Sequence, residues 1–567
     1  MLTITNELAS LGLFTGCSAE DLERVSEAAS PSRALSDGEV LCREGEMADR
    51  WWIVHEGIAD ATAGGLYIGT IGPGETIGEL ALLDREPRNA TVTAVSGLVV
   101  QEVDGERFVD AILSTPQLAL TLLRQTAGRL RHSTRLVTQS APVGSDQAAP
   151  TTTPTETGPG SSPAAQAVFN PGAPGFFANP YDQYALLRAH DPVHHSAGTG
   201  AYLITGYDDV LRLSRDRSMM VSIVHAITTP AIEAERARLE ATGGMAAASM
   251  LRQDGDDHTR LRRLVTKVFT PRAIGQWRDR VETIVEGLLV EAAGRDCIDV
   301  IDDYSLLLPA QIISEMLGMP NGDIPQLRRW SDAITKTLDP INTPEENAAS
   351  VAAVNDMSKY LEAVIEDKRV HPVDDILSAL IEASDGGDRL SPLELKAQVL
   401  LLYIAGHETT TNLVGNGLTH LLEAPDQLDR LRTDPSLDAN AVEELFRFDS
   451  PVQMTRRIAI EDIEVSGKTI PAGSVALLCL ASANRDANKW GPSADRLDLT
   501  RAGANEHLSL GGGAHYCLGA ALARLETQIS LPRLVRRFPR LAPAYDAPAW
   551  RTRLVLRGVE HLRVTLR

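Results

Sequence analysis

The chain has 567 residues, of which 43% are hydrophobic and 23% charged, a length that indicates at least two domains and a composition typical of folded proteins. Its net charge of −22 argues against nucleic acid as a partner, because a phosphate backbone binds clustered Lys and Arg. No apolar run reaches the roughly 18 residues of a membrane span, so we expect no membrane insertion. The five cysteines lie far apart without a C-x-x-C pair, which indicates neither a zinc site nor a disulfide framework and favours a cytoplasmic location.

Before residue 105 the chain contains short apolar runs separated by Gly-bearing turns, which predict the strands of a compact β-roll. Examples of these runs are Arg50 to Val54, Leu66 to Ile71 and Ala90 to Val95. Residues 117 to 137 then carry Leu123, Ala127 and Leu130 at helical spacing. That stripe is either part of the core of the same domain or the seam of a homodimer.

Residues 77 to 92 read I-G-E-L-A-L-L-D-R-E-P-R-N-A-T-V. A Gly-Glu step that opens a short helix exposes backbone N–H groups to an anion, and the fork of Arg88 suits a phosphate. The run resembles the phosphate-binding cassette of cyclic nucleotide-binding domains of the cAMP-receptor type, with Ile77 in place of the usual Phe. The resemblance implies a regulatory site for a cyclic nucleotide, cyclic AMP favoured over cyclic GMP; a β-roll that has lost its ligand is the alternative. The implied site residues are Gly78, Glu79, Leu80, Arg88 and Asn89.

From Ser140 to Ala165 the sequence consists mostly of Pro, Thr, Ser, Gly and Ala, which is the composition of a flexible linker. Long helical patterns dominate after it. We therefore predict a nucleotide-binding domain over residues 1–138, a linker over 139–167 and a helical domain over 168–567.

Two motifs of the second domain lie in helical patterns. His258 and Arg262 are four residues apart on one helix face and suit a carboxylate. Further on, the apolar helix from Leu400 to Thr411 is interrupted by A-G-H-E-T-T at 405–410. An acid and a hydroxyl in such a helix cost free energy unless they have partners or a function, although a solvated helix edge is the simpler interpretation.

A third motif pairs Glu444 with Arg447, which share a helix face and, taken alone, make an ordinary salt bridge. The fourth is the loop L-G-G-G-A-H-Y-C-L-G at 510–519, which leads into a helix. Backbone N–H groups and the helix dipole favour a thiolate at Cys517. Its glycines let the backbone pass close to a flat ligand.

Together and in this order the four motifs resemble the cytochrome P450 family, with Leu510 in place of the usual Phe of the cysteine loop. The resemblance extends over about residues 169–567 and implies a mainly α fold that holds haem b, with Cys517 as the axial iron ligand. It implies that the haem propionates contact His258, Arg262, Arg457 and His515. It assigns oxygen activation to Gly406, Glu408 and Thr409, and a structural group to Glu444, Arg447 and Arg496.

The expected fold class is therefore multidomain, with an N-terminal α+β cyclic nucleotide-binding fold followed by a mainly α P450 fold. The expected function is a monooxygenase that inserts one oxygen atom from O2 into an apolar small molecule, because a thiolate ligand favours O–O cleavage. Electrons are expected from a separate ferredoxin and ferredoxin reductase. The alternatives are a haem and nucleotide sensor without turnover, a transcription regulator, a peroxygenase and a nitric oxide reductase. Glu408 and Thr409 favour an enzyme, since a sensor needs no proton path.

Overall fold

The computed structural model describes residues 29–108 and 167–567, apart from short gaps at 37, 64–65, 72–75, 79–86, 89, 106, 174, 197–198, 268, 341, 383 and 386–387. The chain divides into two compact units, Met1–Thr152 and Thr153–Arg567. The predicted helix at 117–137 with its dimer seam, and the predicted linker up to residue 166, lie outside the described residues.

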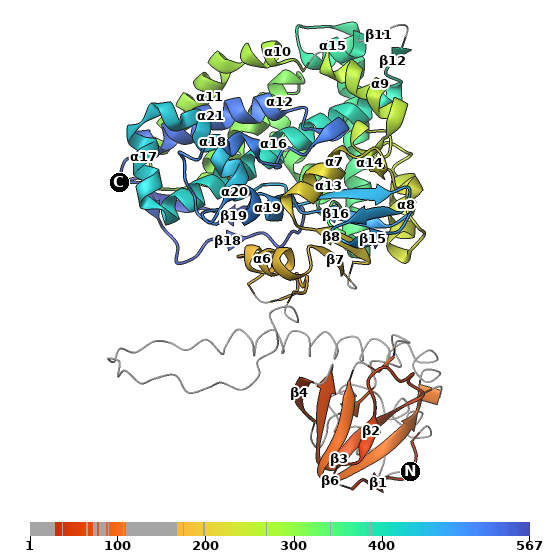
Figure 1. Ribbon diagram of the computed structural model, residues 1–567. Helices are drawn as coiled ribbons and strands as arrows, with labels where there is room; N and C mark the ends of the chain where they lie inside the picture. Colours follow the sequence, from red (N-terminus) through yellow and green to blue (C-terminus); the bar gives the residue numbers. More distant parts are fainter. Residues whose placement is uncertain are drawn as a thin grey trace, which may run out of the picture. The chain divides into compact units, whose positions relative to one another are not determined.

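The first unit is an antiparallel sheet (Figure 1), which confirms the predicted β-rich fold. Its strands run in the order β1-β6-β3-β4, with β2 on β6 and β5 on β3. The two long strands pair from Arg50 with Asp104 to Thr62 with Thr91, and register shifts between them mark β-bulges that bend the sheet. Its buried side includes Trp52, Val54, Val92 and Val100. The strands are β1 (Arg33–Ala34), β2 (Val40–Cys42), β3 (Arg50–Ala63), β4 (Leu66–Ile71), β5 (Thr76–Ile77) and β6 (Thr91–Asp104).

The second unit is mainly helical, as predicted. Its longer helices are α6 (Tyr181–His190), α7 (Tyr207–Arg215), α8 (Pro230–Ala241), α9 (Gly255–Thr266), α10 (Pro271–Gly275), α11 (Arg278–Ala293), α12 (Leu307–Met316), α13 (Ile324–Lys336), α14 (Pro344–Val370), α15 (Ile376–Glu382), α16 (Pro392–Glu423), α17 (Pro425–Thr433), α18 (Asp438–Phe448) and α21 (Ala520–Arg537). Short helical turns are η3 (Ile223–His225), η4 (Met250–Arg252), η5 (Ile301–Ser305), η6 (Asn321–Asp323), η7 (Pro435–Leu437), α19 (Leu480–Ala483), α20 (Ala487–Trp490), η8 (Ala504–Glu506) and η9 (Gly513–His515).

A five-stranded sheet accompanies the helices, in the order β7-β8-β16-β13-β9. Strands β8 and β16 pair in parallel, and the other neighbours are antiparallel. Its strands are β7 (Val193–Ser196), β8 (Ala201–Ile204), β9 (Met219–Met220), β13 (Thr455–Ala459) and β16 (Val475–Leu478). Smaller sheets use β10 (Cys297–Asp299), β11 (Ser384–Asp385), β12 (Asp388–Arg389), β14 (Ile463–Val465), β15 (Lys468–Ile470), β17 (Ala542–Pro543), β18 (Ala549–Trp550), β19 (Val559–His561) and β20 (Arg563–Thr565).

Helix α16 runs through the middle of the second unit, among α12, α18 and α21 (Figure 1). It begins with a capping box, in which the Ser391 hydroxyl accepts from the Glu394 N–H and the Glu394 carboxylate accepts from the Ser391 N–H. Most of its residues are buried, so the polar side chains that it carries are costly unless they have partners. Within the described parts of the chain, no helix has the length and apolar character needed to cross a membrane.

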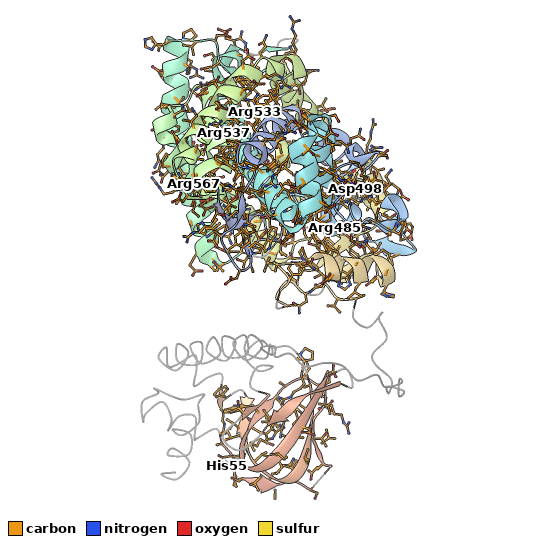
Figure 2. All side chains as sticks on the ribbon, turned by 90° about the vertical axis from the view of Figure 1, so that its left-hand side faces the viewer. His55, Arg485, Asp498, Arg533, Arg537 and Arg567 are labelled. Atoms are coloured by element: carbon orange, nitrogen blue, oxygen red, sulfur yellow. The ribbon has the colours of Figure 1, made fainter. Side chains whose placement is uncertain are left out.

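A buried charged network holds α6 against the rest of the unit. The Tyr181 hydroxyl donates to Asp449 at 2.7 Å, and the Arg557 guanidinium binds the same carboxylate at 2.9 Å. Arg485, labelled in Figure 2, stacks on the Tyr181 ring at 3.5 Å. His420 completes the network with its Nε2 atom 2.7 Å from Asp449. All these polar groups are paired, as a buried network requires.

Candidate active site

The loop before α21 holds Cys517 in a backbone shape that only glycine adopts easily. Gly511 and Gly513 have φ values of +72° and +63°, in the left-handed region. A Cβ atom at Gly513 would lie 2.6 Å from the Ser214 carbonyl oxygen, because the end of α7 presses on the loop. The Cys517 N–H donates to the Leu510 carbonyl at 2.8 Å and closes the loop. The cysteine thus stands at the predicted step from loop to helix.

The surroundings of the Cys517 sulfur act on its ionisation in two directions. Burial raises the pKa of the thiol, whereas the Gly519 N–H and the positive charges of Arg262 and Arg524 lower it. Burial outweighs these groups, so the pKa of the thiol is raised overall. A bound metal ion would take the thiolate form.

Four cationic or donor side chains predicted from the sequence come together beside this loop, and we call them the cation cluster: His258, Arg262, Arg457 and His515. The rings of His258 and His515 lie 4.1 Å apart between centroids. His515 Nε2 is 3.9 Å from the Asp254 carboxylate, whose charge also acts on Arg457. Arg262 donates to the Tyr516 carbonyl at 2.5 Å.

The cation cluster contains a donor without a partner. The His258 Nε2 atom is buried and makes no hydrogen bond to any residue that the structure describes. Burial, together with the charges of His515 and Arg262, lowers the pKa of His258 to about 4. Burial likewise lowers the pKa of Arg457 to about 10. An acidic ligand group would satisfy the donor and balance the charge, so these residues fit a haem, whose two propionates would meet them beside Cys517.

In its middle, helix α16 has one side that is less buried than the rest. Ala405 is exposed and Thr409, one turn later, is half-buried, although the surrounding residues are mostly buried. The Thr409 hydroxyl donates to the Ala405 carbonyl at 2.9 Å, a bond to the preceding turn that often bends a helix. A Cβ atom at Gly406 would lie 3.1 Å from Ile313 of α12, so this glycine is also needed where the two helices pack.

Glu408 lies on a different side of α16 from Thr409, since successive helix residues point about 100° apart. It is 4% exposed, and its carboxylate accepts from Arg551 Nη1 at 2.6 Å. Sequence analysis missed Arg551, which follows β18 in a segment with no periodic pattern. The structure therefore places the acid in an ion pair and the hydroxyl on the open side.

The structural group around Glu444 requires one correction. Arg447 binds the Glu444 carboxylate with two parallel hydrogen bonds of 2.7 and 2.8 Å, and both side chains are fully buried. The second cation is Arg501, whose Nε lies 3.1 Å from the same carboxylate. The prediction of Arg496 was wrong: its side chain is exposed, and its carbonyl oxygen accepts from Arg447 and Arg501.

In the first unit, Arg88 is 5% exposed and already has partners. It donates to the Gly78 carbonyl at 3.1 Å and to the Arg50 carbonyl at 2.5 Å, and it lies 4.8 Å over the ring of Trp52. Gly78 has a φ of +84°. The other three predicted nucleotide residues, Glu79, Leu80 and Asn89, lie outside the described residues. A phosphate at this place would have to share the guanidinium with the two carbonyls.

Known proteins match both units. The family model of cytochrome P450 matches residues 230–549, and that of the cyclic nucleotide-binding domain matches residues 32–115. The vitamin D(3) 25-hydroxylase of Pseudonocardia autotrophica is 41% identical over 397 residues, which cover 69% of this chain and 94% of that protein. Cytochrome P450 107B1 of Saccharopolyspora erythraea is 41% identical over 399 residues, covering 69% and 95%.

Among solved structures, P450BioI in complex with an acyl carrier protein ligated to hexadec-9Z-enoic acid is similar, with a TM-score of 0.65 and 32% identity. The match covers 71% of this chain and 100% of that chain. The chain therefore belongs to the cytochrome P450 family of monooxygenases and carries a cyclic nucleotide-binding domain before its haem domain.

Proposed function

We propose that this chain inserts one oxygen atom from O2 into an apolar small molecule, with Cys517 as the axial ligand of haem b. The observation that carries the proposal is the position of the Cys517 loop beside the cation cluster with its unpaired buried donor. When bound, the haem supplies the oxygen chemistry, because a thiolate ligand favours O–O cleavage. In this proposal His258, Arg262, Arg457 and His515 hold the two propionates.

Proton delivery falls to Glu408 and Thr409 in this proposal. The Thr409 hydroxyl stands on the open side of α16 and can hold a proton where the substrate side of the site is expected. Glu408 is held by Arg551 on another side of the helix. It must therefore leave that ion pair before it can pass a proton toward Thr409, so Arg551 controls the acid.

Electrons come from a separate ferredoxin and its reductase in this proposal, as is typical of bacterial members of the family. A reducing cytoplasm is consistent with the cysteines, since Cys42, Cys297, Cys479 and Cys517 are all free among the described residues. We keep the domain bounds of 1–138, 139–167 and 168–567 as part of the proposal.

The enzyme can be tested by reconstitution with a bacterial ferredoxin, its reductase and NADH under ¹⁸O2, using vitamin D3 and hexadec-9Z-enoic acid as trial substrates. We expect NADH consumption that requires ferredoxin, and a product that carries one ¹⁸O atom. Direct oxidation of NADH by nitric oxide without ferredoxin would instead identify a nitric oxide reductase. Oxygen consumption that stays at the level of the haem-free protein would contradict a monooxygenase.

We further propose that cyclic AMP binds the first domain and changes turnover. Because Arg88 already donates to two carbonyls, a bound phosphate would share its guanidinium with them, using its remaining N–H donors. An effect on turnover would correspond to a coupling of about 1–3 kcal/mol, which is a change of about 5- to 150-fold. Calorimetry on the full chain should detect binding of cyclic AMP. Arg88→Lys should lower the affinity by about tenfold, because Lys lacks the forked guanidinium. The proposal for the first domain would be contradicted if calorimetry detected no heat of binding with either cyclic AMP or cyclic GMP at high micromolar concentration.

A further inference from the structure

Gln398 of α16 binds the backbone of a segment that lies 148 to 150 residues earlier in the chain. Its side chain is fully buried, and its Oε1 atom accepts from the Met250 N–H at 2.9 Å. Its Nε2 atom donates to the Ala248 carbonyl at 3.0 Å and to the Glu394 carbonyl, one turn earlier on α16, at 3.2 Å. Without this amide, buried backbone groups of the distant segment would lose their partners, which is costly.

Residues 242–254 form the segment that Gln398 binds, and we call it the turn segment. Gly243 and Gly244 near its start have φ values of +61° and +79°, and Gly255 directly after it has a φ of +58°. These left-handed positions let the chain change direction at both ends, and residues other than glycine adopt them only rarely. Among the described residues, no other side chain from outside the turn segment bonds its backbone. Gln398 is therefore the hydrogen-bonded attachment of the turn segment to α16.

Gln398 shares one face of α16 with two residues of the candidate active site. Ala405 and Thr409 follow it by seven and eleven residues, which is close to two and three helical turns at about 3.6 residues per turn. At Gln398 this face is covered by the turn segment, and the side chain is fully buried. At Ala405 the same face is exposed. The turn segment therefore borders the less buried side of α16.

The far end of the turn segment reaches the cation cluster. Asp254 Oδ1 lies 3.9 Å from His515 Nε2. The same carboxylate accepts from the Val221 N–H at 3.0 Å and from the Ser222 N–H at 2.8 Å. The turn segment thus extends from the Thr409 face of α16 to the residues proposed to hold the propionates, which are the two parts of the proposed haem site.

A glutamine at this position costs more free energy than an apolar side chain would. Its neighbours on α16 are buried and apolar, among them Leu395, Val399 and Leu402. A buried amide loses its hydration, and a glutamine loses more side-chain entropy than a leucine does. Apolar contact has no direction, so an apolar residue would allow several positions of the turn segment. One donated and one accepted hydrogen bond allow a single position.

We propose that Gln398 is a positioning residue, which fixes the turn segment at the border of the Thr409 face and thereby limits the size of the molecule that reaches the haem. It acts through the turn segment and contacts no reacting atom. Without the amide, the glycines at both ends would let the turn segment move away from α16. The proposal rests on the proposed function, because it concerns access to the same haem site.

The test uses the haem-loaded full chain and two probes that bind haem iron through an imidazole nitrogen. These are imidazole itself and 1-tritylimidazole, which carries three phenyl rings. Stopped-flow mixing follows the shift of the haem absorption band and gives the association rate of each probe. Hydrogen exchange of the turn segment is measured on the same proteins and does not depend on the probes.

Two variants change the amide, and a third is the matched control. Gln398→Met keeps the length of the side chain and removes its hydrogen bonds. Gln398→Glu keeps the acceptor for the Met250 N–H and removes the donor to the Ala248 carbonyl. The control is Gln427→Met, because Gln427 of α17 is also buried and also accepts from a backbone N–H, that of Leu499, at 3.0 Å.

We expect Gln398→Met to raise the association rate of 1-tritylimidazole by about tenfold and that of imidazole by less than about twofold, since about tenfold is the effect of losing a buried hydrogen bond. Gln398→Glu should lie between the wild type and Gln398→Met, and Gln427→Met should resemble the wild type. Hydrogen exchange of the turn segment should become faster in both Gln398 variants but not in Gln427→Met.

Unchanged association rates in Gln398→Met would overturn the proposal, even if hydrogen exchange of the turn segment became faster, because Gln398 would then serve stability alone. Equal acceleration of both probes would also overturn it, as would the same acceleration of the bulky probe in Gln427→Met. A failed proposed function would appear differently, as the absence of the carbon monoxide band in the wild type, and this proposal would fail with it.

Discussion

The Glu444 cluster, consisting of Glu444, Arg447 and Arg501, and the cation cluster look alike in sequence but differ in their hydrogen bonds. Arg447 gives its donors to Glu444 and to the carbonyls of Asn484, Ala494 and Arg496. In the cation cluster, His258 Nε2 is buried without a described partner. A buried charge group that is fully paired inside the protein stabilises the fold, whereas one with an unpaired donor is prepared for a ligand.

The largest effect is expected from breaking the Glu444 cluster. Glu444→Gln leaves Arg447 and Arg501 buried without their carboxylate, which costs about 3–5 kcal/mol of unfolding free energy. Urea unfolding and haem content after expression would measure the loss. The control is Arg496→Ala, which should change stability by no more than about 0.5 kcal/mol, because that side chain is exposed. If Arg496→Ala lowered the unfolding free energy as much as Glu444→Gln, Arg496 and not Arg501 would be the second cation of the group.

A smaller and different effect is expected in the cation cluster. Arg457 donates to the Thr455 hydroxyl and the Arg456 carbonyl, but the charge of Asp254 offsets its burial only in part. Arg457→Met removes this buried charge, so the unfolding free energy of the haem-free protein should stay the same or rise. Haem affinity should fall by about tenfold or more, the usual worth of a charged hydrogen bond. Urea unfolding of the haem-free protein measures the first quantity, and titration of the same protein with haem measures the second. The exposed Lys359→Met serves as the control. If Arg457→Met destabilised the haem-free protein as strongly as Glu444→Gln, the contrast between the clusters would be lost.

The smallest effect concerns pH and the paired network of His420. Burial lowers the pKa of His420, but its hydrogen bonds to Asp449 and Glu423 more than offset this, so the pKa is raised. A raised pKa in the folded state stabilises the protein fully below the unfolded value of about 6.5, and this contribution is lost as pH rises through the folded value. We therefore expect His420→Gln to lower the free energy of unfolding more at pH 6 than at pH 9. An equal loss at both pH values would contradict the charged pairing.

Sequence reasoning succeeded where the chemistry follows a short motif. The Cys517 loop and the pair His258 and Arg262 could be named because glycines, a histidine and an arginine stand at fixed spacings. Arg457 and His515 were named only through the resemblance to the family. It failed for Arg501, which stands in a loop five residues after Arg496, where no period separates one arginine from the next. Arg551 was invisible for the same reason, since its partner Glu408 lies 143 residues earlier in the chain. Pairing across such separations depends on the packed fold.

The same limit applies to the first unit. The strand at 66–71 and the β-rich fold were predicted from short apolar runs between Gly-bearing turns, and the structure confirms them. The partners of Arg88 were not predicted, because Trp52 and the Arg50 carbonyl reach it only through the pairing of β3 with its neighbours. Whether Arg88 binds phosphate therefore stays a prediction.

The most direct test of the central claim is the carbon monoxide difference spectrum of the reduced full chain, compared with its Cys517→Ser and Cys297→Ser variants. Cys297 is exposed and lies in β10, so its variant controls for the loss of a thiol. We predict a band at roughly 450 nm in the wild type and in Cys297→Ser. The band should be absent in Cys517→Ser, whether or not that variant keeps its haem. A band that persists in Cys517→Ser would contradict Cys517 as the haem ligand.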